Sequence, residues 1–206
     1  MLIRHNEKVL PGKQCAKGLW LVKPEGLNRG KGIEVFNNTK DIMNFIGGKN
    51  PRSRYVIQKY IERPLLYKLR KFDIRVWALY TGDDDRIYYY KRGYLRTSSD
   101  EFTTRINDNK AVHLTNNCFQ QHLDNYGKFE DGNTLSFEAF QEYLDETFPD
   151  ANLNVYEHIV KRMKDIVIDV FLAAKDEFNK NNRDHAFELF GFDFLIDEDF
   201  RVWLLE

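Results

Sequence analysis

Two acidic residues, Asp193 and Glu206, lie in otherwise apolar segments near the end of the sequence. Both segments read as short apolar strands, and a short turn separates them, so we expect a β-hairpin. With a turn at residues 197–200, Asp193 would lie across from Leu204, and Glu206 diagonally beside it on the same face. Two carboxylates on a half-buried face are costly unless a cation separates them, and Mg²⁺ prefers such oxygen ligands. The alternative is two acids at a solvated sheet edge.

A Gly-rich turn at residues 23–32 could cover phosphates. It carries three glycines and three cations, namely Gly26, Gly30, Gly32, Lys23, Arg29 and Lys31. It is not a Walker A loop, because its glycines are one residue too close and no Ser or Thr follows the lysine. Its exposed backbone N–H groups could still bind phosphate oxygens. An ordinary basic hairpin turn is the alternative.

Alternating charges occupy a predicted strand at residues 70–77. Lys71, Asp73 and Arg75 share one face, because side chains alternate along a strand. A lysine, a carboxylate and an arginine in one row suit the base, ribose and phosphates of a nucleotide. A structural salt bridge within the strand is the alternative.

A polar segment at residues 113–117 begins with His113 and contains Thr115 and Asn116. Thr and Asn often form turns and caps, so we assign His113 a structural role and the other two a site-lining role. Lys91, Arg92 and Arg96 form a separate basic cluster. It is either a solvated face or a surface for an acidic peptide.

The remaining pattern places strands in clusters flanked by helices, which indicates the α+β class. Helices are expected at residues 40–46, capped by Asn38 or Thr39, from Ser136 and, after a capping box at Asn154, over the longest helical stretch. The expected buried stripe of that last helix is Ile159, Met163, Ile166, Val170 and Ala174.

Composition restricts the classes of protein that remain. The formal net charge is −1, which gives no global argument for binding nucleic acid or a membrane. Cys15 and Cys118 are too few and too distant for a disulfide framework or zinc site, and no apolar run reaches membrane-spanning length. A reducing, cytosolic setting is expected. Both ends look unfinished, as in a fragment of a longer protein.

The ordered set of motifs resembles the tubulin–tyrosine ligase and ligase-like family from about Gly18 to Glu206. The motifs follow one another as the Lys23 strand, the Gly-rich turn, Gln58-Lys59-Tyr60-Ile61, Lys71-Phe72-Asp73-Ile74-Arg75, Leu95-Arg96-Thr97-Ser98, His113-Leu114-Thr115-Asn116, Asp193 and Glu206.

The resemblance implies an α+β ATP-grasp fold whose two lobes clasp a nucleotide cleft, with the N-terminal lobe incomplete in this chain. It divides the sequence into a poorly defined segment at 1–17 and a ligase-like domain at 18–206. Within that domain, residues 18–60 would form the flap and hinge part, and residues 61–206 the C-terminal lobe.

The resemblance also implies roles for individual residues. Arg75 and Arg96 would act on the transferring phosphoryl group and the substrate, and Asp193 and Glu206 would bind Mg²⁺. The residues implied to bind ATP are Lys23, Arg29, Gly30, Gly32, Gln58, Lys59, Tyr60, Ile61, Lys71, Asp73, Thr115 and Asn116. The family's further Asn metal ligand, two residues after the Glu206 position, is not in this chain.

The implied activity is ATP-dependent addition of an amino acid to a glutamate carboxylate through an acyl phosphate. The acceptor would be tubulin or another acidic protein tail, with Lys91, Arg92, Arg96 and Arg105 supplying local positive charge. The free amino acid could be tyrosine, glutamate or glycine, and the location cytoplasmic, with cytoskeleton or cilium as finer expectations. Two alternatives remain, an inactive tubulin- or microtubule-binding module and an ATP-grasp ligase for a small molecule.

Overall fold

The structure is a computed structural model whose contacts divide the chain into two units. It describes residues 18–27, 30–50, 52–82, 86–105, 110–178, 180–181, 183 and 185–206. One unit, here the carboxyl-terminal unit, comprises Phe72–Thr97 and Thr134–Glu206, and the other, the amino-terminal unit, comprises residues 18–71 and Ser98–Asn133. The division predicted from the sequence, at residue 60, stays a prediction.

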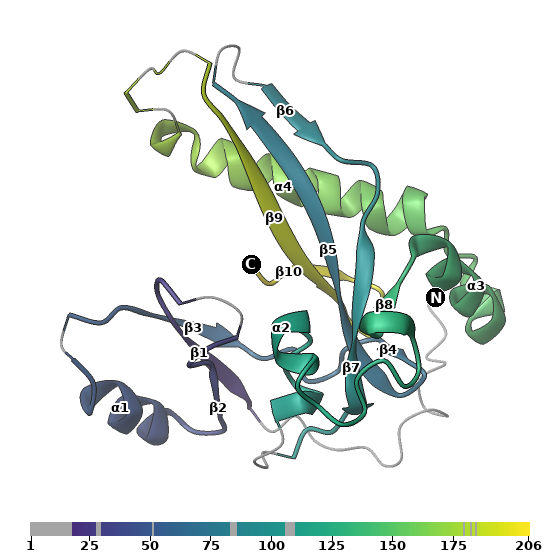
Figure 1. The fold of residues 1–206 in the computed structure, drawn as a ribbon, viewed down its shortest axis with the longest axis horizontal. Helices are drawn as coiled ribbons and strands as arrows, with labels where there is room; N and C mark the ends of the chain where they lie inside the picture. The colour runs from purple at the N-terminus through teal and green to yellow at the C-terminus, as the bar shows by residue number, and fades with distance from the viewer. Residues whose placement is uncertain are drawn as a thin grey trace. The chain divides into compact units, whose positions relative to one another are not determined.

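The amino-terminal unit begins with a three-stranded antiparallel sheet. Strand β1 (Trp20–Pro24) lies between β2 (Glu34–Phe36) and β3 (Tyr55–Lys59). Helix α1 (Thr39–Gly47) lies beside this sheet in Figure 1. Asn38, one of the two caps that the sequence offered, caps α1 by accepting a hydrogen bond from the backbone of the first turn.

Two further elements of this unit position polar residues. Strand β4 (Leu66–Tyr67) turns back onto the first residues of β5 through Lys68 and Leu69, both left-handed with φ of 47° and 66°. Two left-handed residues make the tight hairpin turn that matches strand twist, although such residues are usually Gly or Asn. Helix α2 (Asn117–Gln120) follows the polar segment that starts at His113.

The carboxyl-terminal unit is built on antiparallel strands in the order β10-β9-β5-β7-β8, with β6 paired to the end of β5. The bounds are β5 Arg70–Thr81, β6 Arg86–Tyr89, β7 Tyr94–Glu101, β8 Thr134–Leu135, β9 Phe187–Ile196 and β10 Val202–Leu204. The unit boundary falls inside β5, after Lys71, and inside β7, after Thr97.

Helices cover one face of this sheet. Helix α3 (Phe137–Thr147) begins at its Ser136 cap, and α4 (Lys161–Ala173) follows a π-helix, Val155–Val160, that Asn154 caps. Figure 1 shows α4 running along β9 and β5. Single turns of 3₁₀ helix occur at Lys110–Val112, Asp131–Asn133, Pro149–Ala151 and Lys175–Glu177.

The buried stripe of α4 differs from the prediction beyond its first two members. Ile159 and Met163 are buried as expected, but Val167 and Phe171 complete the stripe in place of Ile166, Val170 and Ala174. The side that α4 buries is fixed by the sheet, because Phe171 packs on Phe190 and Phe192, with ring centroids 5.3 and 6.0 Å away. In the described part of the chain, no helix is long and apolar enough to cross a membrane.

Candidate functional site

The β9–β10 hairpin forms as predicted, but its register is shifted by one residue. Leu204 pairs with Phe194, so the prediction that Leu204 lies across from Asp193 is wrong. The turn is shorter by one residue, because Asp197 pairs with Arg201 and leaves only residues 198–200 between the strands, with Phe200 in a left-handed conformation, φ 61°. A one-residue slip exchanges the faces of all following side chains, so this shift alone would move Glu206 away from the face of Asp193.

A β-bulge at the end of the hairpin restores the pairing of the two acids. The N–H groups of Leu205 and Glu206 both donate to the carbonyl oxygen of Asp193, at 2.7 and 3.3 Å. The Asp193 N–H donates to the Glu206 carbonyl at 2.8 Å. Two residues therefore oppose one. Asp193 and Glu206 are direct backbone partners, closer than the diagonal neighbours that the sequence predicted.

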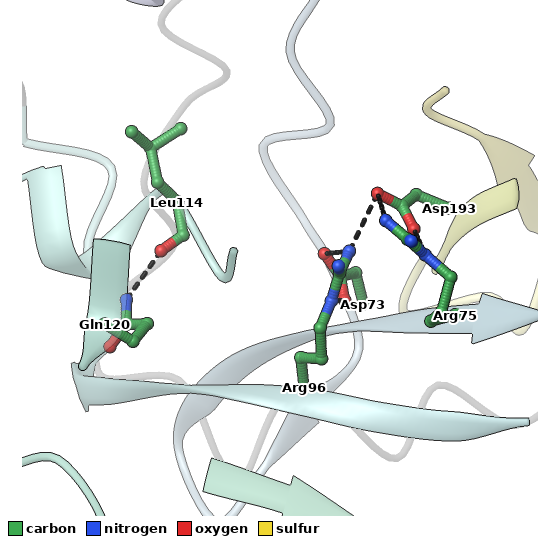
Figure 2. A network of polar contacts seen from close by, with 6 residues as sticks. All are labelled: Asp73, Arg75, Arg96, Leu114, Gln120 and Asp193. Carbon is green, nitrogen blue, oxygen red and sulfur yellow. Dashed lines mark hydrogen bonds and ion pairs between the residues drawn. The ribbon is translucent and has the colours of Figure 1, made fainter. Parts of the chain in front are cut away.

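The carboxylate of Asp193 binds two arginines, as Figure 2 shows. Arg75 donates Nε to Oδ1 at 2.5 Å and Nη2 to Oδ2 at 3.0 Å, and Arg96 places Nη2 2.8 Å from Oδ2. Strand pairing explains the first contact, because Arg75 on β5 is directly opposite Asp193 on β9. Gly191 provides the space, since a Cβ there would lie 3.0 Å from Nη1 of Arg75.

Arg96 also binds Asp73, so four charges form one network. Its Nε and Nη2 donate to Asp73 at 2.6 and 2.7 Å, and Asp73, Arg96 and Asp193 are each at most 5% exposed. Burial by itself would lower the pKa of Arg96, but the two carboxylates more than offset this and raise it. The hydrogen bond with Asp193 is the main cause that raises the pKa of Arg75. Both guanidinium groups therefore stay charged.

The oxygen ligands of this unit fit a magnesium ion in part. Asp193 Oδ2 accepts two hydrogen bonds and Oδ1 accepts one, which leaves acceptor capacity at Oδ1. Glu206 is exposed, and its carboxylate makes no hydrogen bond or ion pair with any described residue. Among those same residues, no group of three or more metal-ligating side chains comes together. An ion would thus depend on these two carboxylates and on oxygens from phosphates or water.

In the amino-terminal unit, the Gly-rich turn has the backbone that a phosphate cover needs. Gly30 and Gly32 have φ of 74° and 72°, which side chains other than Gly rarely adopt. A Cβ on Gly30 would lie 3.3 Å from Oδ1 of Asn116, so the turn lies against that residue. Lys23 is on β1, paired with Val56. Arg29 lies outside the described residues.

The predicted hinge, residues 58–61, covers the end of β3 and the start of the loop after it. The Lys59 ammonium lies 2.5 Å from Glu62 and 3.0 Å from the Leu19 carbonyl, which fixes it in the structure. Oε1 of Gln58, by contrast, is buried and has no hydrogen-bond partner among the described residues. A buried acceptor without a partner suits a donor such as the adenine amino group, so this segment fits a nucleotide base. Tyr60 is buried and Ile61 half-buried.

The structure brings Lys71, Tyr60 and His113 together in the same unit. Lys71 Nζ donates to the His113 carbonyl at 2.9 Å and to the Tyr60 hydroxyl at 3.3 Å. Thr115, buried, and Asn116, half-buried, follow on the same segment. The family resemblance implied one nucleotide site for Tyr60, Lys71, Thr115 and Asn116, whereas His113 was assigned a structural role. Nothing in the sequence predicted its contact with Lys71.

Several residues that support these groups were missed. Gln120 is fully buried and bonds to Ser99 N, Ala111 O and Leu114 O. Asp197 holds the hairpin turn by accepting from Asp199 N, Arg201 N and Trp203 Nε1. Asp197 was visible as a turn residue, whereas Gln120 has no sequence signal, because its partners are known only from the folded chain.

The basic cluster is also smaller than predicted. Arg96 is 5% exposed, so it is not part of a solvated basic face. Lys91, Arg92 and Arg105 are exposed. The pairing of strands explains the difference, because Arg96 points to the charged side of β5.

The structure thus combines a mixed α+β fold with a buried carboxylate–guanidinium network in one unit and a glycine-rich turn in the other. Comparison with known families is more specific. The model of the tubulin-tyrosine ligase family matches residues 1–206, and the chain belongs to this family.

Characterised relatives in this family include several glycylases. The chain is 36% identical to tubulin glycylase 3B of Tetrahymena thermophila over 191 residues, 92% of this chain and 16% of that protein. It is 38% identical to tubulin glycylase 3A of Drosophila melanogaster over 197 residues, 92% of this chain and 19% of that protein. With tubulin monoglycylase TTLL3 of Homo sapiens it shares 36% over 200 residues, 92% of this chain and 25% of that protein. The chain thus spans a quarter or less of these relatives.

Proposed function

We propose that this chain is part of an ATP-dependent ligase that joins an amino acid to a glutamate carboxylate of tubulin or of another acidic protein tail. The observation that carries the proposal is the network in which Asp193 binds Arg75 and Arg96. Backbone hydrogen bonds place Glu206 directly opposite Asp193, and the Glu206 carboxylate has no partner among the described residues. Family membership supports the reaction class. The amino acid we propose is glycine, since the relatives above are named as glycylases.

The network supplies the charges that phosphoryl transfer needs. Two arginines would offset negative charge on the transferring phosphoryl group, and Asp193 and Glu206 would hold Mg²⁺. Because the guanidinium groups are already fixed by carboxylates, little reorganisation is required when the anion arrives. Mg²⁺, when bound, would screen the ATP phosphates. Arg96 retains Nη1 for the acceptor carboxylate or the acyl phosphate formed from it, since its other donors bind Asp73 and Asp193.

The amino-terminal unit would bind the nucleotide. Lys23 and the turn at Gly30 and Gly32 would cover the phosphates, with Arg29 as a further cation. The segment 58–61 would meet the adenine, for which the buried, unpartnered Oε1 of Gln58 is suited. This assignment amounts to an ATP-grasp fold in which residues 18–60 form the flap and hinge part of a domain spanning 18–206.

The remaining nucleotide and acceptor contacts follow the same assignment. Lys71 and Asp73 would touch the nucleotide, and Thr115 and Asn116 would line its site. Exposed Lys91, Arg92 and Arg105 would attract the acidic tail. The setting that fits these partners is the cytoplasm and its microtubules, including those of cilia.

The experiment is an amino acid transfer assay on tubulin. The protein is incubated with Mg²⁺-ATP, tubulin and glycine, glutamate or tyrosine, and the tubulin tails are analysed by mass spectrometry. We expect glycyl additions, lost in Glu206→Gln. This variant should fold normally, because Glu206 is exposed and its side chain has no described partner. Glu188→Gln, on the exposed part of β9, is the matched control and should retain activity.

The outcomes separate the alternatives. Addition of glutamate or tyrosine would replace glycine in the proposal. Turnover of ATP without any modified protein would favour a small-molecule ligase. Failure to bind ATP would favour a tubulin-binding module without catalysis, and full activity of Glu206→Gln would contradict the magnesium assignment.

A further inference from the structure

A buried polar cluster in the amino-terminal unit contains a histidine that the reaction described above does not use. His113, Tyr60 and Lys71 are 5%, 3% and 6% exposed. The Tyr60 hydroxyl lies 2.9 Å from Nδ1 of His113, and their rings pack edge to face with centroids 5.5 Å apart. The Lys71 ammonium also lies over the Tyr60 ring, 4.7 Å from its centroid. Every member of the cluster therefore contacts the other two.

The hydrogen bonds assign the protons in this cluster. Lys71 can only donate, so Tyr60 accepts from it, and the arrangement that gives the hydroxyl proton a partner has the Tyr60 O–H donating to Nδ1 of His113. Nδ1 is then the unprotonated nitrogen, and the neutral ring carries its proton on Nε2. Burial, and then the nearby Lys71 charge, lower the pKa of His113 to about 4, so the ring is neutral at physiological pH. Burial also raises the pKa of Tyr60, which therefore keeps its proton.

The imidazole is not explained by packing alone. Its Nε2 is buried and makes no hydrogen bond of ordinary geometry with a described residue, although the Arg105 backbone is near enough to raise the pKa of the ring; such an arrangement disfavours folding. An apolar side chain of similar size would fill the space without that penalty. What the imidazole adds is the Nδ1 acceptor, which orients the Tyr60 hydroxyl toward it and leaves the oxygen lone pairs facing Lys71.

The backbone at His113 is held in place by hydrogen bonds, so its carbonyl can fix the position of the Lys71 ammonium. Its carbonyl accepts from Lys71 at 2.9 Å. The next carbonyl, that of Leu114, accepts from Nε2 of Gln120 at 2.6 Å, a contact drawn in Figure 2. Gln120 Oε1 accepts in turn from the Ser99 N–H at 2.7 Å. The segment is thus tied to β7, and the carbonyl that binds Lys71 is held in place.

We propose that His113 is a positioning residue for nucleotide binding, which holds Lys71 through its own carbonyl and through the Tyr60 hydroxyl. The inference rests on the proposed function, because it takes Lys71 to contact the nucleotide. The side chain of Lys71 has several rotatable bonds, so the position of its ammonium group depends on acceptors that are fixed in the structure. A misplaced ammonium weakens ATP binding even though the charge is still present.

The test compares three variants by their affinity for Mg²⁺-ATP and by KM and kcat. His113→Leu keeps the volume without the acceptor, Tyr60→Phe removes the hydroxyl, and His113→Asn offers an oxygen near the Nδ1 position. We expect the first two to weaken ATP affinity and raise the KM for ATP about tenfold, with a smaller change in kcat. The Asn variant should recover most of the affinity. The double variant His113→Leu with Tyr60→Phe should bind ATP no more weakly than either single variant, because both substitutions remove the same hydrogen bond.

The outcomes distinguish the two proposals. A wild-type protein that does not bind Mg²⁺-ATP overturns the proposed function and this inference with it. A wild-type protein that binds, together with folded His113→Leu and Tyr60→Phe variants of unchanged affinity, overturns only the role of His113. If His113→Leu does not fold, Tyr60→Phe decides alone. Equal loss in the Leu and Asn variants would also contradict the role, because it would show that the acceptor is irrelevant.

Discussion

At the scale of single residues, Asp193 is the residue on which most of the site depends. It is 3% exposed and balances the charge of two guanidinium groups, of which Arg96 is itself buried. A buried ion pair adds little net stability compared with apolar packing, but loss of one partner leaves an uncompensated buried charge. The metal-binding role proposed for Asp193 and the folding of the sheet are therefore coupled.

Replacement of Asp193 by Asn should consequently lower the free energy of unfolding by about 3–5 kcal/mol. The amide keeps the shape but removes the negative charge between Arg75 and Arg96. Urea unfolding followed by circular dichroism measures the change. Asp165→Asn, at an Asp whose side chain is 53% exposed, is the control and should stay within about 0.5 kcal/mol of wild type. A stable Asp193→Asn variant would show that the network is not energetically coupled.

His113 predicts how stability depends on pH. Its folded-state pKa of about 4 is below the ordinary value of 6.5, so the unfolded chain binds this proton more readily. The contribution is complete above about pH 6.5 and is lost as the pH falls toward 4, in total roughly 3 kcal/mol. Lys71 is the charged group beside the ring, and its charge contributes to the lowered pKa of His113.

Urea unfolding of wild type and His113→Asn at several pH values isolates this contribution, because all other titrating groups are common to both proteins. The wild type should lose more stability than the variant between about pH 6.5 and 4. Parallel pH profiles for the two proteins would be inconsistent with a buried neutral imidazole.

At the scale of elements, the β9–β10 hairpin shows how two local features together place one side chain. The three-residue turn that ends at the left-handed Phe200 shifts the register by one residue, and the bulge at Leu205 and Glu206 adds a residue to the strand. Each change alone would turn Glu206 away from Asp193, and together they keep the pair. Asp197 fixes the first of these features through its three hydrogen bonds.

Asp197→Ala should therefore loosen the site without any change in the residues proposed to bind ligands. The amide of Asp193, which donates to the Glu206 carbonyl, should exchange its hydrogen about tenfold faster or more, since the turn that sets the register loses three acceptor contacts. Hydrogen exchange measured by NMR gives this rate. Asp199→Ala, at an exposed position of the same turn, should leave it unchanged. Equal rates in all three proteins would mean that the bulge holds the register alone.

At the scale of the whole molecule, the elements were more predictable than the contacts between them. The caps at Ser136 and Asn154 and the strands that carry Asp73 and Asp193 follow from local pattern, and the structure confirms them. For α1 the pattern left Asn38 and Thr39 open, and the structure selects Asn38. Local pattern has this power because caps and alternation act over only a few residues.

The unpredictable part is long-range or depends on one unusual residue. The buried stripe of α4 was set by the sheet beneath it, through Phe171. The hairpin register followed from Phe200, a residue type that rarely adopts a left-handed conformation. Burial of Arg96 between Asp73 and Asp193 needed the pairing of β5 with β9, which no local signal contains.

The most direct test of the site assignment is the affinity for ATP, measured by calorimetry with and without Mg²⁺, in wild type, Glu206→Gln and Glu188→Gln. We predict that Mg²⁺ strengthens ATP binding in the wild type and in Glu188→Gln. In Glu206→Gln this strengthening should fall about tenfold or more, because Mg²⁺ loses one of its two proposed carboxylate ligands. The same Mg²⁺ dependence in all three proteins would contradict a magnesium site at Asp193 and Glu206.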